Sequence, residues 1–546
     1  MSLPLASVMA VAAGVQATRS RSAKRDALAA LLRDAGPHEA EILVGLLLGS
    51  PRQGRVGVGW RTVRAVDENA GTTGAPTLTL GDVDAAYDKL ADTHGPGSAR
   101  SREEILTTLW TRASTAERTF LRGTLLGDLR TGALAGVLTD ALAVAIDKPS
   151  AAVRRAVMLG GSLGASAARL LADPDAVDQV TLTVGTPVQP MLAATAAATA
   201  DGTADDSADA LRPRTGGGLL RVEYKLDGAR IQVHKRQDAI AVFTRTHADI
   251  TARVPEIVAL VETFPADSLI LDGETLTLDP SGAPRPFQET MSRFGSGRSH
   301  DAMLAAWFFD ILHLDGRDLI DEPLTQRLDV LAGVVGEHQV PGVFTTDVAR
   351  ADQVLAEVLA EALAAGHEGV MVKDGSSRYA AGRRGTAWRK VKPVHTLDLV
   401  VLAVEWGYGR RTGWLSNLHL GARDPNPMAP NPMASDTPGT PGGQAPGGQA
   451  VGGQAAYVMV GKTYKGLTDE LLRWQTATFP RYAVRETAGV LWLRPELVVE
   501  VAIDGVQRSP RYPGGVALRF ARVRGYRPDK AAAQADTIDA VRALLR

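Results

Sequence analysis

The octapeptide EYKLDGAR, residues 223–230, places Lys225 between a run typical of a β-strand and an Asp-Gly pair typical of a tight turn. A lysine amine becomes a nucleophile when nearby cations and partial burial lower its pKa, which is ordinarily about 10.4. The string alone is weak evidence, because most lysines are solvated and most Asp-Gly pairs are simple turns. Lys225 is therefore a candidate nucleophile whose case depends on the rest of the chain.

Two further strings carry groups that could act on phosphates. Glu274 in LDGE and Glu368 in EGVMVK have the hard oxygen donors that Mg²⁺ prefers. In WRKVKP, strand alternation puts Lys390 and Lys392 on one face, from which both could reach the same phosphate. Each residue also has a simpler interpretation, as a carboxylate beside a turn or a lysine on an exposed strand.

Composition limits the class of protein. Lys plus Arg number 60 and Asp plus Glu 61, so the net charge of −1 leaves any basic surface local. Such a local surface is predicted at 505–530, where Asp529 is the only acid. The absence of cysteine excludes disulfides, a thiol nucleophile and cysteine-ligated zinc. No apolar run reaches the roughly 18 residues of a membrane span, and we expect no membrane partner and a cytoplasmic protein.

In order and rough spacing, these strings resemble the motif set of the ATP-dependent DNA ligases. The resembling strings are EYKLDGAR, LDGE, FFDILHLDG at 308–316, EGVMVK, WRKVKP and RFARVRGYRPDK at 519–530. The resemblance implies that ATP adenylylates Lys225, that the AMP passes to a 5′-phosphate at a nick in duplex DNA, and that the 3′-hydroxyl displaces it. It also implies use in DNA replication, repair or recombination. The NAD-dependent ligases carry a four-cysteine zinc module, which this chain cannot build.

The resemblance implies a set of ATP- and AMP-contacting residues: Glu223, Arg230, Arg245, Glu274, Phe309, Arg384, Lys390 and Lys392. Glu223 would recognise the adenine N6 amine and Phe309 would stack on the adenine. Arg230 and Arg245 would hold the ribose and the nick phosphate. The family usually has a glycine at the position of Thr246 or His247, so the loop that carries Arg245 departs from the pattern.

The resemblance further implies a metal site and a pyrophosphate site. Glu274 and Glu368 would hold Mg²⁺ or Mn²⁺, and Lys373, Lys390 and Lys392 would supply the positive field around the nucleophile. In the last motif, the residues expected to orient the pyrophosphate are Arg519, Asp529 and Lys530. Because one surface cannot cover ATP and admit a nick together, we expect the C-terminal domain to turn about a hinge near 392–397.

Patterning predicts a multidomain chain. Residues 1–182 read as an all-α domain, with apolar positions recurring at three and four and Ser150 as a helix N-cap. By resemblance this is a DNA-binding domain in which helix N-termini, Arg122 and Arg130 position phosphates. Residues 183–393 predict an α+β domain with antiparallel sheets and helices at 253–263 and 351–365, which by resemblance is the nucleotidyltransferase (adenylation) domain.

The C-terminal part, residues 394–546, contains five strand-like runs that favour a small β-barrel of the oligonucleotide-binding (OB) type. Residues 424–455 repeat PNPMA and GGQA, a composition that cannot form a core, and we predict a disordered insertion between two strands. We expect a monomer, associated with the nucleoid of a bacterial or archaeal cell, and the sequence identifies no protein partner.

Two other classes remain open from the residues. A capping guanylyltransferase or an RNA ligase shares the KxDG string and the nucleotidyltransferase fold, although the long helical N-terminal region and the RPDK ending argue against both. A nucleic-acid-binding module with an inactive site is disfavoured, because Lys225, Glu274 and Glu368 are all present.

Overall fold

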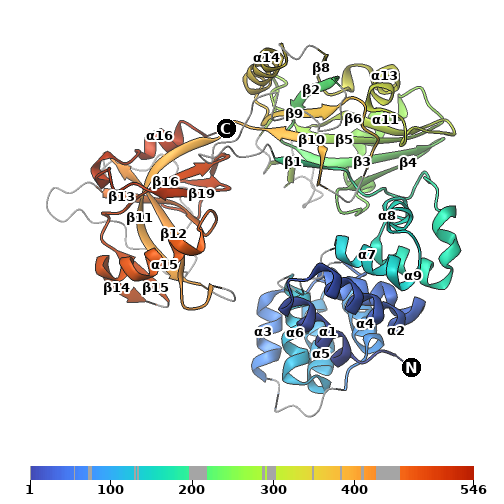
Figure 1. The fold of residues 1–546 in the computed structure, drawn as a ribbon, viewed down its shortest axis with the longest axis horizontal. Helices are drawn as coiled ribbons and strands as arrows, with labels where there is room; N and C mark the ends of the chain where they lie inside the picture. Colours follow the sequence, from blue (N-terminus) through green and yellow to red (C-terminus); the bar gives the residue numbers. More distant parts are fainter. Residues whose placement is uncertain are drawn as a thin grey trace.

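The structure, a computed structural model, describes residues 2–545 except for the following positions: 55, 70, 72–76, 128, 130, 132–134, 196–217, 286–288, 292–302, 347–349, 381–383, 408–410, 426–455 and 488. Arg130 and nearly all of the predicted insertion 424–455 therefore lie outside the described residues. Figure 1 shows the helical N-terminal region, the central sheets and the C-terminal sheet as three bodies. None of the described helices is long and apolar enough to cross a membrane.

The N-terminal body is helical, as predicted. Its helices are α1 (Leu5–Ala17), α2 (Arg21–Leu48), α3 (Trp60–Asn69), α4 (Leu80–Ala91), α5 (Ser98–Arg112), α6 (Thr115–Leu126), α7 (Ala135–Ala145), α8 (Ser150–Leu159) and α9 (Leu163–Ala172). They share one buried apolar core. The cap prediction at Ser150 is wrong: α8 begins at Ser150 behind Pro149, and the Ser150 hydroxyl donates to Asp140 instead, at 3.0 Å.

The central body has two five-stranded sheets (Figure 1). One has the order β1 (Leu192–Thr195), β10 (Arg384–Val391), β9 (Gly369–Asp374), β2 (Leu220–Lys225), β8 (Gly342–Thr345). The other has the order β4 (Ala239–Thr244), β3 (Ala229–Arg236), β5 (Ser268–Thr277), β6 (Leu304–Leu314), β7 (Arg317–Asp318). All their pairs are antiparallel except β1–β10, which is parallel.

Three helices cover these sheets. α11 (Pro255–Glu262) and α13 (Leu324–Val335) pack on the sheet of β3, β5 and β6, and α14 (Ala351–Ala364) packs on that of β2 and β9. The predicted helices at 253–263 and 351–365 are thus confirmed to within a few residues. Lys225, the last residue of β2, and Glu274 of β5 line the same cavity.

The C-terminal body is strand-rich, as predicted. Its elements are β11 (His395–Trp406), β12 (Leu415–Asp424), β13 (Ala456–Thr463), α15 (Asp469–Thr478), β14 (Ala483–Thr487), β15 (Val490–Leu493), β16 (Val498–Ile503), β17 (Gly505–Arg508), β18 (Val516–Arg519), β19 (Arg522–Tyr526) and α16 (Ile538–Arg542). The sheet order is β13-β12-β11-β15-β14, with β16 joining β11 to β19 and β17–β18 forming a separate hairpin. The pairs of the described strands leave the sheet open, an arrangement compatible with a partly open OB barrel.

The N-terminal and central bodies meet in a small apolar cluster. Met158 and Leu159 of α8 pack with buried side chains of the central sheets, among them Ile270, Leu312 and Trp388. Arg155 also pairs with Asp321, at 2.6 Å. The domain boundaries themselves, 1–182, 183–393 and 394–546, stay predictions.

Candidate active site

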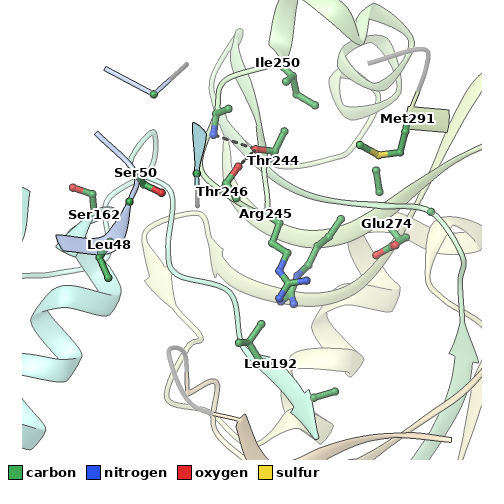
Figure 2. Close-up of a pocket in the computed structure, with 18 of the residues that line it drawn as sticks. Leu48, Ser50, Ser162, Leu192, Thr244, Arg245, Thr246, Ile250, Glu274 and Met291 are labelled. Carbon is green, nitrogen blue, oxygen red and sulfur yellow. Dashed lines mark hydrogen bonds between the residues drawn. The ribbon is translucent and has the colours of Figure 1, made fainter. Parts of the chain in front are cut away.

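A cavity of about 2140 Å³ lies among the three bodies. Its wall includes Lys225 and Glu274 of the central sheets, Arg519 of β18, and residues 48–54, 56–59 and 162–164 of the helical body. Figure 2 shows Leu48, Ser50 and Ser162 on one side and Arg245 and Glu274 on the other. The candidate nucleophile thus faces a space large enough for a nucleotide and a part of a larger ligand.

Lys225 ends β2, and the ladder to β9 brings Glu368 beside it. Lys225 Nζ contacts the Glu368 carboxylate, and the Glu368 N–H donates to the Lys225 carbonyl at 3.0 Å. Lys392 contacts the other oxygen of the same carboxylate. Burial works to raise the pKa of Glu368, but the charges of Lys225 and Lys392 outweigh it and lower this pKa. Burial, together with the charge of Lys225, lowers the pKa of Lys392.

Two glycines make this close approach possible. A Cβ on Gly228 would lie 2.2 Å from the Thr275 carbonyl oxygen, and a Cβ on Gly369 would lie 2.3 Å from that of Val391. Gly369 also has a φ of 149°, which side chains disfavour. The glycines of KLDG and EGVMVK therefore serve packing between strands at the site.

Glu274 lies on β5 opposite Arg230 of β3. Burial raises the pKa of Glu274 to about 7, against the lowering effect of the Lys225 and Arg230 charges. A carboxyl group in this state takes up a cation readily, because a bound positive charge offsets the cost of ionising it in a buried place.

Arg230 is held in a fixed orientation. Its Nε and Nη2 donate to the two oxygens of Asp272 at 2.9 and 2.6 Å, and its Nη1 donates to the Met191 carbonyl at 2.6 Å. The Phe309 ring centroid lies 5.3 Å from the guanidinium carbon, and Phe309 meets Trp388 edge-to-face at 5.9 Å. Arg230 and Phe309 both line the cavity.

Glu223 and Lys373 form a buried ion pair with side chains 2 % and 1 % exposed. Lys373 Nζ also lies 4.2 Å from the Trp388 ring centroid and donates to the Phe309 carbonyl at 3.2 Å. Burial lowers the pKa of Lys373, although Glu223 opposes the shift. One Glu223 oxygen is buried without a hydrogen-bond partner among the described residues. Lys373 therefore neutralises Glu223, whereas Lys392 contacts the same carboxylate as Lys225.

The loop that follows β4 carries Arg245, an exposed residue on the cavity wall. His247 adopts a φ of 66°, the left-handed conformation that glycine takes at no steric cost. The Thr244 hydroxyl accepts from the Ala248 N–H at 3.1 Å and closes the turn. The backbone thus has a glycine-like shape where the family usually has glycine, and histidine adopts it here.

The last motif divides between two places. Arg519 donates to Asp227 of the KLDG string at 2.9 Å and lines the cavity. Lys530 contacts Asp398 instead, and Asp529 pairs with Arg527 at 2.6 Å. Neither Lys530 nor Asp529 is among the described residues that line the cavity.

Three family models match consecutive parts of the chain. They are described as DNA ligase N terminus, over residues 61–143, ATP dependent DNA ligase domain, over 190–392, and ATP dependent DNA ligase C terminal region, over 447–530. A probable DNA ligase of Pseudarthrobacter chlorophenolicus is 54% identical over 533 residues, 97% of each chain. One from Rhodococcus opacus is 51% identical over 98% of this chain and 99% of its own. The chain belongs to the ATP-dependent DNA ligase family.

The fold also resembles that of solved ligase structures. The solved structure named Pmar-Lig_Pre has a TM-score of 0.60 and 19% identity, and covers 95% of this chain and 99% of its own. The match of a ligase model to the N-terminal helices favours a DNA ligase over the guanylyltransferase and RNA-ligase alternatives.

The positions of the other predicted residues are as follows. Arg384 begins β10 opposite Leu192, and its side chain is outside the described residues. Arg122, predicted to position DNA phosphates, pairs with Asp67 at 2.9 Å and is not among the described residues that line the cavity, and its role stays a prediction. Lys390 and Lys392 both line the cavity, as the alternation of KVK predicts.

Sequence reasoning missed three groups that the site contains. Asp272 lies inside LDGE and could have been found as the only other carboxylate of that string. The glycine-rich segment 49–59, which lines the cavity from the helical body, had a visible composition signal. Tyr379 gives no signal in the sequence.

Proposed function

We propose that this ligase seals nicks in duplex DNA through a lysyl-AMP at Lys225 and a 5′-adenylated DNA. The observation that carries the proposal is the contact of Lys225 with Glu368 in a cavity bounded by all three bodies. The pathway served is DNA replication, repair or recombination. We also propose a monomeric, cytoplasmic enzyme associated with the nucleoid. The relatives with DNA-ligase names are bacterial, which supports a bacterial host.

In the first step, the Lys225 ammonium loses a proton to solvent, the neutral Nζ attacks the α-phosphorus of ATP, and a second N–H proton leaves as the phosphoramidate forms. An N–P bond forms, the bond from that phosphorus to the bridging oxygen breaks, and pyrophosphate leaves. In the second, an oxygen of the 5′-phosphate at the nick attacks the same phosphorus, and the N–P bond breaks. In the third, the 3′-hydroxyl attacks the 5′-phosphate and AMP leaves. Glu368 holds the Lys225 amine at the cavity wall throughout the first step.

The residues that bind ATP and AMP in this proposal are Glu223, Arg230, Arg245, Glu274, Phe309, Arg384, Lys390 and Lys392. Glu223 Oε2 accepts no hydrogen bond among the described residues, although Arg221 Nε lies 3.6 Å away, so this oxygen suits an adenine amine, and Phe309 offers a ring to the base. Arg230 and Arg245 present guanidinium groups to ribose and phosphate oxygens.

A divalent cation fits the carboxylates present. Glu274 and Glu368 are hard oxygen donors on the cavity wall, and no group of three or more His, Cys, Asp or Glu side chains that could hold a metal occurs among the described residues. Mg²⁺ or Mn²⁺ would therefore take one or two carboxylates and complete its shell with water and phosphate oxygens. When bound, the ion neutralises phosphate charge.

Arg519, Asp529 and Lys530 are proposed to orient the pyrophosphate. Arg519 already reaches Asp227, whereas Lys530 is held by Asp398 on β11. For Lys530 to reach the nucleotide, the C-terminal body would have to turn about residues 392–397, which we propose as the hinge. The contact of Lys530 with Asp398, which lies within that body, would also have to break.

The proposal is tested with Lys225→Ala and, as a matched control, the exchange of a lysine on helix α4, Lys89→Ala. Each protein is mixed with Mg²⁺ and labelled ATP or GTP, with and without nicked duplex DNA. We expect the control to carry one acid-stable AMP and to seal DNA, and Lys225→Ala to do neither. Covalent AMP on Lys225→Ala, or labelling by GTP in place of ATP, would refute the proposed lysyl-AMP mechanism.

A further inference from the structure

Side chains on one face of β3 hydrogen-bond to residues 184–191, the segment that joins the helical body to the central sheets. Alternate residues of the strand bond to the backbone of residues 184–191: Arg236 to the Val184 carbonyl, His234 Nδ1 to the Gly185 N–H at 2.9 Å, Gln232 to the Val188 N–H at 2.7 Å and carbonyl at 3.2 Å, and Arg230 to the Met191 carbonyl at 2.6 Å. Side chains two apart on a strand share a face, so the segment runs along β3. Each of these four side chains holds part of the segment against the strand.

Tyr379 adds a hydrogen bond at Met191, the end of this segment. Its hydroxyl accepts from the Met191 N–H at 3.0 Å and donates to Asp272 Oδ2 at 2.7 Å. Tyr379 and Arg230 thus bond the N–H and the carbonyl of the same residue. The Tyr379 side chain is 2 % exposed and meets the buried Trp388 edge-to-face at 6.1 Å. It comes from the segment between β9 and β10, far along the chain from the groups that it joins.

These bonds determine where the Arg230 guanidinium points. Asp272 accepts from its Nε and Nη2, the Met191 carbonyl accepts from its Nη1, and the Tyr379 hydroxyl accepts from its Nη2 at 3.4 Å. Asp272 is 1 % exposed, so its own position depends on its few partners, of which Tyr379 is the neutral one. Buried hydrogen bonds of this kind hold a charged group within a few tenths of an ångström.

We propose that Tyr379 is a positioning residue that, directly and through Asp272 and Met191, holds Arg230 toward the bound nucleotide and couples the interdomain segment to the active site. The inference rests on the proposed role of Arg230 in phosphate and ribose binding. Removing the hydroxyl takes the acceptor from the buried Met191 N–H and leaves Asp272 Oδ2 with Arg230 Nη2 as its remaining donor, which loosens Arg230. A small displacement of such a group slows the reaction rather than preventing ATP binding.

The test uses Tyr379→Phe in the full chain, with Tyr87→Phe as the matched control. Tyr87 is equally buried, and its hydroxyl has no hydrogen-bond partner among the described residues, so the control removes the same atom without a bond. Measured quantities are the rate constant and ATP KM of self-adenylylation and the single-turnover sealing of a pre-adenylated nick. We expect Tyr379→Phe to slow at least one rate constant roughly 10-fold with less than a twofold change in KM, and Tyr87→Phe to match wild type.

The Arg230→Ala background distinguishes a positioning role of Tyr379 from a purely structural one. If Tyr379 acts through Arg230, adding Tyr379→Phe to Arg230→Ala should cost less than about twofold, because the group to be positioned is gone. A full loss in that background, or no loss in the wild-type background, would overturn the positioning role. Normal sealing by Arg230→Ala would instead overturn the proposed role of Arg230 and the inference with it. Should Tyr379→Phe fail to fold, Asp272→Asn replaces it in the same cycle with the same expectations.

Discussion

The half-buried carboxyl group of Glu274 should make the folded enzyme less stable at high pH. Its position on β5 lies between Arg230 and the end of β2, and burial raises its pKa to about 7 from an ordinary value of 4.5. Replacing it with glutamine removes the ionisable group and keeps the shape. We therefore expect Glu274→Gln to be more stable than wild type at pH 8 while losing activity.

The sign and size follow from the two pKa values. Below pH 4.5 the group is protonated in both folded and unfolded chains, and the favourable contribution of the folded-state proton is present in full. That contribution is lost as the pH rises through about 7, where the folded protein must ionise Glu274. Each pH unit between the two values corresponds to about 1.4 kcal/mol, which sets an upper limit of about 3 kcal/mol at pH 8. The cavity admits water, so about 1 kcal/mol or somewhat more is the working expectation.

Calorimetry of the apoprotein from pH 5 to pH 8 measures this directly. About 1 kcal/mol corresponds to about 2–4 °C in the transition of a domain of this size. The matched control is Glu262→Gln, an exposed carboxylate on α11, which should leave the transition unchanged. A Glu274→Gln transition below that of wild type at pH 8, or a difference between the two proteins that does not grow with pH, would refute the reasoning.

Three further outcomes are expected. Glu368→Ala should slow sealing roughly 10²-fold, the scale of a lost electrostatic contact, with the fold retained; near-wild-type sealing at limiting Mg²⁺ would contradict it. Replacing residues 424–455 with a short Gly-Ser turn should leave the melting temperature and sealing nearly unchanged, because β12 and β13 are paired up to the insertion and loop length changes closure entropy little. A large loss of either would show that the insertion packs against the rest of the protein. Changing Arg519 and Lys530 together to Ala should abolish self-adenylylation and leave some sealing of a pre-adenylated nick, and an equal fall in both assays would exclude a pyrophosphate role.

The sequence by itself determined the class of fold and the identity of most groups in the site. Strand-like runs and helical periodicity are local properties, so the helices near 253–263 and 351–365 could be predicted from spacing alone. The alternation in KVK likewise predicted Lys390 and Lys392 on one face, since the side-chain period of a strand is two. The nucleophile and both carboxylates were visible because they lie within short strings.

Only the tertiary structure decided which groups pair and how they ionise. Lys373 neutralises Glu223, and Arg519 reaches Asp227 while Lys530 is held by Asp398. Tyr379 gave no signal, because its value lies in bonds to residues distant in sequence. Such partnerships depend on how the sheets and bodies pack, which local periodicity does not encode. Burial also depends on tertiary packing. The raised pKa of Glu274 results from many surrounding atoms, and no neighbour in the sequence predicts it.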